Sequence, residues 1–576
     1  MTPLLSIKNL SVQFNNDGNL SRAVSNNSFT VAPGELVAIV GESGSGKSVT
    51  ALSILQLLPK SATVSGEILF GKNEPVDLLQ LSPRKITGIR GNEIAMIFQE
   101  PMTSLNPVFT CGYQVMEVIR LHQQVSKEIA RQKTIELFEK VKLPEPAALL
   151  NRYPHELSGG QKQRVMIAMA MSCNPALLIA DEPTTALDVT VQKTILELIK
   201  SLQQPAGSGG QNNMGVIFIT HDLGVVADIA DKILVMYKGE IAEQGKTADI
   251  LSSPQHPYTK ALLACRPAGK PKGKRLPVVS DFIETGAGVN LQTANYKTST
   301  EPDGQTLSSQ LRTTVLEVNN LTVQFPIKKN LFGKPVQFFN AVDDVSFKVS
   351  QGDIVGLVGE SGCGKTTLGR SILQLIKPSS GKIMLGEKDL AHTGRHELRH
   401  MRKDLQIVFQ DPYGSLNPRI TIGNAILEPL KVHSVLSDKN QRKEKVMELL
   451  EKVSLDTSHF NRYPHQFSGG QRQRICIARA LALNPSFLIF DESVSALDVS
   501  VQAQVLNLLN DLKDEFGFTA IFISHDLSVV HYICNRILVM HKGKIVEEGD
   551  ADQIYYHPDN EYTKKLVGAI PGKSIS

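Results

Sequence analysis

The sequence predicts an α/β protein that contains two copies of one phosphate-binding domain. The first observation is the glycine-rich stretch Gly41–Ser48, which lies between an apolar run typical of a buried strand and a segment whose apolar residues recur at helical spacing. The second is the return of this stretch as Gly359–Thr366, again after an apolar run. The third is the length of 576 residues, which exceeds what one hydrophobic core supports.

The glycine-rich stretch has the pattern G-x-x-x-x-G-K-[ST] of a loop that binds phosphate. Its glycines let backbone N–H groups surround an anion, and the N-terminus of the following helix adds a favourable dipole. Lys47 can reach the β- and γ-phosphates of a nucleotide, and the Ser48 hydroxyl can ligate Mg²⁺. The residues predicted to bind nucleotide in the two loops are Gly41, Ser43, Gly44, Ser45, Gly46, Lys47, Ser48, Val49, Gly359, Ser361, Gly362, Cys363, Gly364, Lys365, Thr366 and Thr367.

Other segments of the first half complete a domain, and they recur in the second half. The predicted strands are Leu4–Phe14, Leu36–Val40, Gly66–Phe70, Ile94–Phe98, Ala176–Ala180 and Val216–Thr220, and helices are predicted over Val115–Val141 and from Leu157–Gln161 onward. The corresponding segments are Leu316–Phe325, Ile354–Val358, Leu405–Phe409, Ser486–Phe490, Ala520–Ser524 and Phe467–Gln471. Twenty-three residues separate Ser158 from Asp181, and the same number separates Ser468 from Asp491. The sequence therefore indicates one duplicated domain, in which Pro205–Gln211 is a surface-loop insertion of the first copy.

Polar residues stand where the predicted strands end. Asp181 suits Mg²⁺ coordination, directly or through water, and the carboxylate of Glu182 can polarise an attacking water. Gln99 can complete the metal shell and sense the γ-phosphate, and His221 can hydrogen-bond that phosphate. A lone histidine here is more often structural, but its recurrence before Asp-Leu in both halves favours a functional role. The corresponding residues of the second half are Gln410, Asp491, Glu492 and His525, with Thr366 as its hydroxyl ligand for the metal.

Together these motifs resemble the ATP-binding cassette (ABC) family over nearly the whole chain. The matching motifs are Walker A, Q-loop, LSGGQ signature, Walker B, D-loop (Ala-Leu-Asp at 186–188 and 496–498) and His switch. The resemblance implies two tandem nucleotide-binding domains, each with a RecA-like P-loop core, a helical subdomain (about 103–175 and 414–485) and a small antiparallel β region. It also implies that the two domains pack head to tail, with each ATP between one Walker A and the other domain's signature.

The resemblance assigns further residues to the nucleotide. The signature residues carried over as contacts to the γ-phosphate from the opposite domain are Ser158, Gly160, Ser468 and Gly470. Gln161 and Gln471 are assigned to the nucleotide-binding residues as well. Phe14 and Phe325 occupy the place where the family stacks an aromatic ring on adenine, and the alternative for each is a core phenylalanine at a strand end.

A narrower resemblance is to the nickel/peptide importer ATPases, and within them to the fused peptide-importer type. It rests on the Q-loop stretches Phe98–Pro107 and Phe409–Pro418, on the motif His256-Pro-Tyr-Thr259, and on its reduced copy Glu561-Tyr-Thr563. Some relatives carry a cysteine cluster after this motif, but here only Cys265 stands in that region, so we expect no iron–sulfur cluster. Walker B continues with Ser493 in the second half, where the first half has proline; the change removes no catalytic group.

The resemblance implies the ATP-hydrolysing subunit of an importer for di- or oligopeptides or related solutes. ATP and Mg²⁺ are the implied cofactors, and two separate membrane permeases are the implied partners. An extracytoplasmic binding protein would deliver the solute. The implied location is peripheral, at the cytoplasmic face of the inner membrane. The predicted domains are residues 1–268, which include the C-terminal HPYT extension, and residues 313–576, joined by a linker at 269–312 that lacks sustained periodicity.

Composition limits the alternatives. Sixty-one basic and 57 acidic residues leave a net charge of +4, which gives no reason to propose nucleic acid as a partner. The sequence does not begin like a signal peptide, and no run approaches the roughly 18 apolar residues that span a bilayer, so we expect a chain that is soluble by itself. The competing hypothesis is a soluble twin-cassette ATPase that acts on ribosomes or DNA. Such proteins often carry a long charged arm or zinc-binding cysteines, which this sequence lacks.

The six cysteines are scattered, which favours free thiols in a reducing compartment. Cys363 lies two residues from Lys365 at a predicted helix N-terminus. We expect this positive field to favour the thiolate and to make Cys363 reactive.

Overall fold

The computed structural model describes residues 2–16, 19–99, 104–185, 187–203, 213–283, 313–329, 332, 335–495 and 497–572. The predicted insertion at Pro205–Gln211, most of the predicted linker, and Ala186 and Ala496 of the two D-loops lie outside these residues.

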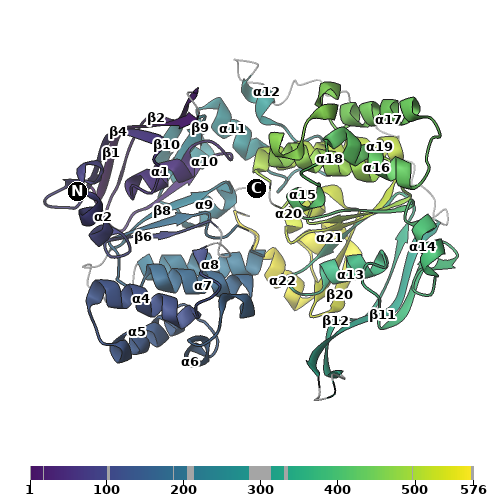
Figure 1. Ribbon diagram of the computed structural model, residues 1–576, viewed down its shortest axis with the longest axis horizontal. Helices are drawn as coiled ribbons and strands as arrows, with labels where there is room; N and C mark the ends of the chain where they lie inside the picture. The colour runs from purple at the N-terminus through teal and green to yellow at the C-terminus, as the bar shows by residue number, and fades with distance from the viewer. Residues whose placement is uncertain are drawn as a thin grey trace.

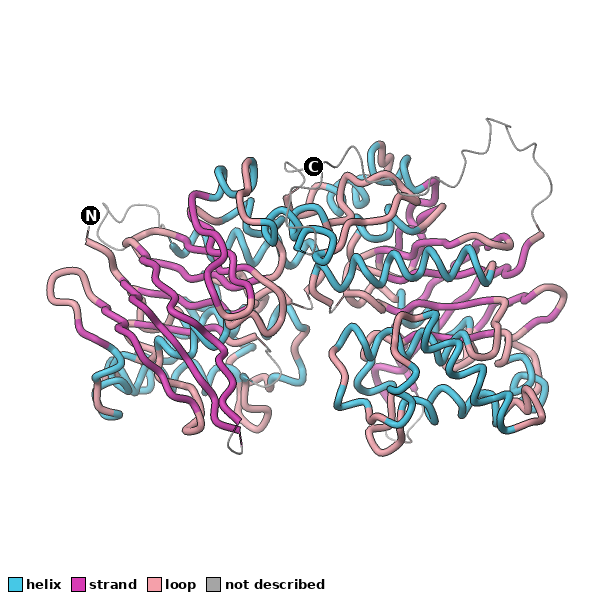
Figure 2. Tube along the Cα trace, turned by 90° about the horizontal axis from the view of Figure 1, so that it is seen from above, coloured by secondary structure: helices cyan, strands magenta, loops and turns pink. Residues whose placement is uncertain are grey.

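Each half contains two sheets and a set of helices, as predicted for a duplicated α/β domain (Figure 1). The larger sheet has six strands in the order β10-β9-β3-β8-β7-β6, and the second half repeats it as β20-β19-β13-β18-β17-β16. The neighbouring strands of this sheet are parallel except for one antiparallel edge pair, β9–β10 or β19–β20. The smaller antiparallel sheet has the order β2-β1-β4-β5, repeated as β12-β11-β14-β15. In Figure 2 the strands of the two halves form separate blocks.

The elements of the first half are β1 (Leu5–Asn16), β2 (Asn19–Val31), β3 (Leu36–Val40), α1 (Lys47–Ile54), β4 (Ala62–Phe70), β5 (Val76–Asp77), α2 (Pro83–Ile89), β6 (Ile94–Ile97), α4 (Cys111–Gln123), α5 (Lys127–Lys140), α6 (Pro146–Leu149), α7 (Gly159–Ala170), β7 (Leu177–Asp181), α8 (Val189–Gln203), β8 (Gly215–Thr220), α9 (Leu223–Ile229), β9 (Lys232–Tyr237), β10 (Glu240–Lys246), α10 (Thr247–Ser252), α11 (Pro257–Ala264) and α12 (Val279–Ile283).

The elements of the second half are β11 (Thr314–Lys329), β12 (Pro335–Ser350), β13 (Ile354–Val358), α13 (Lys365–Ile372), β14 (Ser380–Leu385), β15 (Lys388–Asp389), α14 (Arg395–Met401), β16 (Leu405–Val408), α15 (Pro412–Ser415), α16 (Ile422–Val432), α17 (Lys439–Lys452), α18 (Gly469–Leu481), β17 (Phe487–Asp491), α19 (Val499–Phe516), β18 (Thr519–Ile523), α20 (Leu527–Ile533), β19 (Arg536–His541), β20 (Lys544–Asp550), α21 (Ala551–Tyr556) and α22 (Glu561–Val567).

The central strands are apolar along their whole length because both faces of the large sheet are covered. Every residue of β3, β7 and β8 is buried, which is typical of parallel strands between helical layers. These strands are neighbours in the sheet, and their carboxyl ends meet at one edge. That edge carries Gly41, Glu182 and His221, which follow the three strands directly.

The helical subdomain of the first half contains α4, α5 and α7. The sequence predicts one helical pattern over Val115–Val141, but the structure has two helices there. The first ends at Gln124, which has a φ of +52°, and Ser126 then caps the second by accepting a hydrogen bond from the backbone N–H of Ile129. No helix among the described residues has the length and apolarity that a membrane span requires.

The C-terminal segments of the two halves cross over. Residues 265–283 follow α11 of the first half and reach the second half, although the sequence predicts a linker from residue 269. Leu276 is buried in the core of the second half, and its backbone N–H and C=O pair with the Asn507 side chain, both at 2.8 Å. Tyr532 donates a hydrogen bond to the carbonyl of Lys274 at 2.8 Å.

The end of the chain crosses in the opposite direction. The backbone N–H of Gly572 donates to Asp228 of the first half at 3.2 Å, and Arg266 donates to the carbonyl of Pro571 at 3.1 Å. In Figure 1, α22 lies beside α8 of the first half, and the Lys193 side chain of α8 donates to the carbonyl of Gly568. We call residues 265–283 and 568–572 the crossing segments.

Candidate active sites between the two halves

The Walker A turns have the shape that the sequence predicts. Gly46 has a φ of +99°, and a Cβ at this position would lie 2.6 Å from the carbonyl oxygen of Ala23, so only glycine fits. Lys47 follows as the first residue of α1, and its Nζ donates to the carbonyls of Gly41 and Glu42, both at 2.8 Å. Burial lowers the pKa of Lys47, although nearby carboxylates oppose the shift.

The second Walker A turn repeats this arrangement. Lys365 donates to the carbonyls of Gly359 at 2.7 Å and Glu360 at 2.9 Å. Each lysine therefore binds the turn of its own half, beside the backbone N–H groups at the start of the helix.

The predicted metal ligands are adjacent in both halves. The Ser48 hydroxyl donates to Asp181 at 3.0 Å, and Thr366 donates to Asp491 at 2.9 Å. Burial raises the pKa of both aspartates, because a buried carboxylate is poorly solvated. Hydroxyl and carboxylate oxygens are the ligands that Mg²⁺ prefers, so these residues fit the metal.

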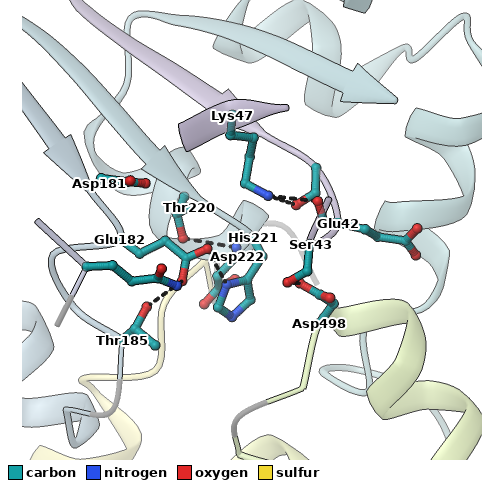
Figure 3. A network of polar contacts seen from close by, with 12 residues as sticks. Glu42, Ser43, Lys47, Asp181, Glu182, Thr185, Thr220, His221, Asp222 and Asp498 are labelled. Atoms are coloured by element: carbon teal, nitrogen blue, oxygen red, sulfur yellow. Dashed lines mark hydrogen bonds and ion pairs between the residues drawn. The ribbon is translucent and has the colours of Figure 1, made fainter. Parts of the chain in front are cut away.

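Glu182 lies directly after β7 in a left-handed backbone conformation, with a φ of +47°. This conformation is costly for a residue with a Cβ and is typical of functional sites. The carboxylate accepts hydrogen bonds from Gln99 and Thr185, both at 2.9 Å, and His221 Nδ1 lies 3.7 Å from it (Figure 3). Burial by itself would raise the pKa of Glu182, but His221, Thr185 and Lys47 together lower it to about 2.

Glu492 has the same environment in the second half, with one difference. Its backbone φ is also +47°. The Gln410 side chain donates to the Glu492 carboxylate at 2.9 Å, and His525 Nδ1 lies 3.4 Å from the same carboxylate. Ser495 takes the place of Thr185, and its hydroxyl donates to the backbone carbonyl of Glu492 instead of the carboxylate. Burial raises and His525 lowers the pKa of Glu492, and the net shift is downward.

Residues of the D-loops connect each Walker A turn to the opposite half. Ser43 donates to Asp498 at 3.1 Å, and Figure 3 shows this aspartate approaching the turn from the other half. In the corresponding contact at the second Walker A turn, the donor is a backbone group: the N–H of Ser361 donates to Asp188 at 3.1 Å. The sequence analysis identified both D-loops but did not place their aspartates among the site residues.

Two glutamates of the Walker A turns add to these contacts. Glu42 accepts a hydrogen bond from Ser500, and Glu360 accepts one from Thr190 at 2.8 Å. Neither was predicted, although the repeat of Glu at the second position of both turns was visible in the sequence.

The signature residues lie at the N-termini of α7 and α18. Ser158 and Ser468 are exposed, and each accepts a hydrogen bond from the backbone N–H of Gln161 or Gln471 in a capping box. Among the described residues, a Cβ at Gly159 would have only Leu187 within 4 Å, and a Cβ at Gly469 would have no neighbour within this distance. The contacts of these residues with the γ-phosphate remain a prediction.

The second glycine of each signature has a packing role that the sequence analysis missed. A Cβ at Gly160 would lie 2.8 Å from Val191, and one at Gly470 would lie 2.2 Å from Val501. A glycine is therefore required where α7 passes α8 and where α18 passes α19.

The two predicted adenine-stacking residues differ. Phe14 is partly buried against the core of its half. Phe325 is 41% exposed and lines a cavity of about 320 Å³ together with Phe339, Lys365 and Glu492. Asp188 of the first half lines the same cavity. Phe14 thus packs part of its surface against the core, whereas Phe325 faces a cavity; adenine stacking by either residue stays a prediction.

The expectation that the positive field favours the thiolate of Cys363 was wrong. Its side chain is buried, and burial raises the pKa of the thiol even though Lys365 lies nearby and opposes the shift. The positive field of the helix N-terminus does not compensate for the loss of solvent around the thiolate.

Comparison with known proteins places these sites in a family context. Residues 24–185 and 342–495 match the ABC transporter family, and residues 242–281 match the family "Oligopeptide/dipeptide transporter, C-terminal region". The chain is 47% identical over 576 residues to the glutathione import ATP-binding protein GsiA of Pectobacterium atrosepticum, covering 99% of this chain and 89% of that protein. It is 48% identical to the GsiA proteins of Escherichia coli K12 (577 residues) and Salmonella typhimurium LT2 (573 residues), with the same coverage.

Proposed function

Because the chain belongs to the ABC transporter family, we propose that it is the ATP-hydrolysing subunit of an importer for small peptides, with glutathione among the candidates. Relatives that carry the name glutathione import ATP-binding protein match it over 99% of its length. The match of residues 242–281 to an oligopeptide/dipeptide transporter region also supports a peptide substrate.

The two sites have the groups that hydrolysis needs. The backbone of the Walker A turn would bind the phosphates, and Lys47 would exchange its carbonyl partners for phosphate oxygens. Ser48 and Asp181, with Gln99, would hold Mg²⁺, which when bound neutralises charge on the phosphate oxygens.

Glu182 would orient the attacking water and accept its proton as the new oxygen–phosphorus bond forms. His221 lies on the other side of the carboxylate and would hydrogen-bond the γ-phosphate. The corresponding residues of the second half would do the same at its site. The hydrogen bond from Gln99 to Glu182 gives a route by which metal and phosphate binding at Gln99 would free the catalytic carboxylate.

We propose that ATP binding closes the interface between the halves. The D-loop contacts already connect each Walker A turn to the opposite half, whereas Ser158 and Ser468 are exposed. Closure would bring these serines and the N-termini of their helices to the γ-phosphates, where the helix dipole favours the negative charge.

A surface cavity in the second half supports permease docking. This cavity of about 390 Å³ lies between the RecA-like core and the helical subdomain, and the Q-loop residue Phe409 lines it. Its rim carries the exposed apolar side chains of Leu375 and Val432. We propose that one of two permeases inserts a cytoplasmic segment here and the other docks at the matching place on the first half. The chain would then act at the cytoplasmic face of the membrane, and a binding protein on the other side would deliver the peptide.

The observation that carries the proposal is that two complete sets of site residues each receive an aspartate from the opposite half. The test is co-expression with candidate permeases, followed by reconstitution into proteoliposomes with ATP at the cytoplasmic side. We expect co-purification and ATP-dependent uptake of radiolabelled glutathione or dipeptides. Copurification with ribosomes or DNA in place of permeases, and no peptide uptake, would favour a soluble twin-cassette ATPase instead.

A further inference from the structure

A helix near the C-terminal end of each half places a tyrosine against the Walker A turn of the same half. Tyr258 in α11 is fully buried, and its hydroxyl accepts a hydrogen bond of 3.0 Å from the backbone N–H of Glu42. Tyr562 in α22 accepts a bond of the same length from the backbone N–H of Glu360. Burial raises the pKa of both tyrosines above the usual value for a phenol.

The tyrosine and the Walker A lysine hold the same peptide unit from its two ends. In the first half, the carbonyl of Gly41 accepts from Lys47, and the N–H of Glu42 in that peptide bond donates to Tyr258. Because a peptide unit is planar, these two bonds fix its orientation. The second half repeats the arrangement with Gly359, Glu360, Lys365 and Tyr562, so it does not depend on one loop conformation.

The sequences that position the two tyrosines differ. In the first half, the His256 side chain caps α11 by accepting a hydrogen bond from the backbone N–H of Tyr258 at 3.1 Å. In the second half, Asn560 caps α22 through the N–H of Tyr562 at 2.8 Å. Different capping residues thus deliver a tyrosine to the same peptide unit, so the position of the hydroxyl does not depend on which side chain caps the helix.

The peptide unit also anchors a contact with the other half. The side chain of Glu42 accepts from Ser500, and that of Glu360 accepts from Thr190. A change in the orientation of this unit would therefore disturb the phosphate-binding turn and the trans contact together.

We propose that Tyr258 and Tyr562 are positioning residues for ATP: each hydroxyl holds the Walker A turn in the shape that binds phosphate. The role of the C-terminal motif is then to serve the nucleotide site of its own half. The inference rests on ATP binding at the Walker A turns and not on the identity of the imported solute.

The test is the double variant Tyr258→Phe/Tyr562→Phe, which removes both hydroxyls and keeps both rings. A fluorescent ATP analogue, titrated without Mg²⁺, measures binding apart from hydrolysis. Leaving a partly buried N–H without its partner is costly, so we expect about five- to twentyfold weaker binding. KM for ATP should rise by a similar factor, with kcat within about twofold of the parent, because Asp181 and Glu182 and their partners are unchanged.

Hydrogen–deuterium exchange of peptides that cover Gly41–Ser48 and Gly359–Thr366 gives a second readout, and we expect faster exchange there in the nucleotide-free variant. The matched control is Tyr237→Phe, because the ring of Tyr237 packs 4.3 Å from that of Tyr258. Its binding and exchange should match the parent. If the double variant does not fold, each single variant gives the same test at one site.

Unchanged nucleotide affinity and unchanged exchange would overturn the proposal. A fall in kcat at constant KM would also overturn it, because that pattern indicates a role in the chemical step. If the tyrosine variants bind nucleotide more weakly and exchange faster, as expected, but the protein does not support peptide uptake, the result would count only against the proposed transport function.

Discussion

Ser43 and Asp498 lie 455 residues apart in the chain, yet the serine hydroxyl donates a hydrogen bond of 3.1 Å to the aspartate carboxylate. At the other turn, the backbone N–H of Ser361 makes the corresponding hydrogen bond to Asp188. Neither phosphate-binding turn is therefore surrounded by its own half alone. Phosphate bound at one turn would lie close to an aspartate that belongs to the other half, so these contacts connect the two turns directly.

Replacing both Glu182 and Glu492 with glutamine should abolish turnover without abolishing ATP binding. The amide keeps the size of the side chain but cannot accept the proton of the attacking water. Loss of such a group typically lowers the rate by 10²–10⁴-fold. Phosphate release measures the rate, and the fluorescent ATP analogue measures binding. Turnover within about tenfold of the parent would contradict the catalytic assignment.

Replacing Asp498 with alanine should weaken communication between the sites. The change removes the acceptor for Ser43. We expect about tenfold slower hydrolysis and a lower Hill coefficient for ATP, since closure of the first site loses a trans contact. Asp511→Ala is the control, because Asp511 is exposed on α19, the helix that begins directly after Asp498. Equal effects of the two substitutions would argue against a role of the contact.

Alkylation should distinguish one cysteine from the other five. Cys173 is half-buried, whereas the other cysteines are buried. Burial raises the pKa of Cys111 to about 11 and of Cys265 and Cys476 to about 12, and it also raises that of Cys363. Since the thiolate is the nucleophile, N-ethylmaleimide at pH 7.5 should modify Cys173 first. Peptide mapping by mass spectrometry over time measures this, and modification of Cys363 as fast as Cys173 would contradict it.

Removing the Asn507 side chain should destabilise the protein. Asn507→Ala leaves the buried N–H and C=O of Leu276 without their partner, at a cost of about 1–3 kcal/mol per group. Calorimetry should therefore show a Tm that is lower by several degrees. The control is Glu197→Ala at the corresponding position of α8, where the side chain is exposed. Equal shifts in both variants would show that the Asn507 pairing adds nothing.

The sequence predicted the fold and the parts of the sites that lie directly after apolar strands. Asp181 and Glu182 could be placed because a strand pattern precedes them and recurs before Asp491 and Glu492. Local patterns do not report contacts between distant segments. Tyr258 meets Glu42 over a separation of 216 residues, and nothing in the periodicity around either residue indicates the other.

The burial of individual side chains could not be predicted from the sequence either. The field around Cys363 was visible in the sequence, but the loss of solvent that reverses its effect on the pKa depends on tertiary packing. The same holds for Gly160, where the nearness of Val191 on another helix is what excludes a side chain.

The crossing segments have a consequence for the order of folding during synthesis. Leu276 leaves the ribosome 231 residues before Asn507, its partner in the core of the second half. At about 5–20 residues per second, this delay is roughly 10–50 s. During that time the first half can fold, but the backbone and side chain of Leu276 lack their partners in the core of the second half. The crossing segment that contains Leu276 can therefore reach its native position only after α19 has been synthesised.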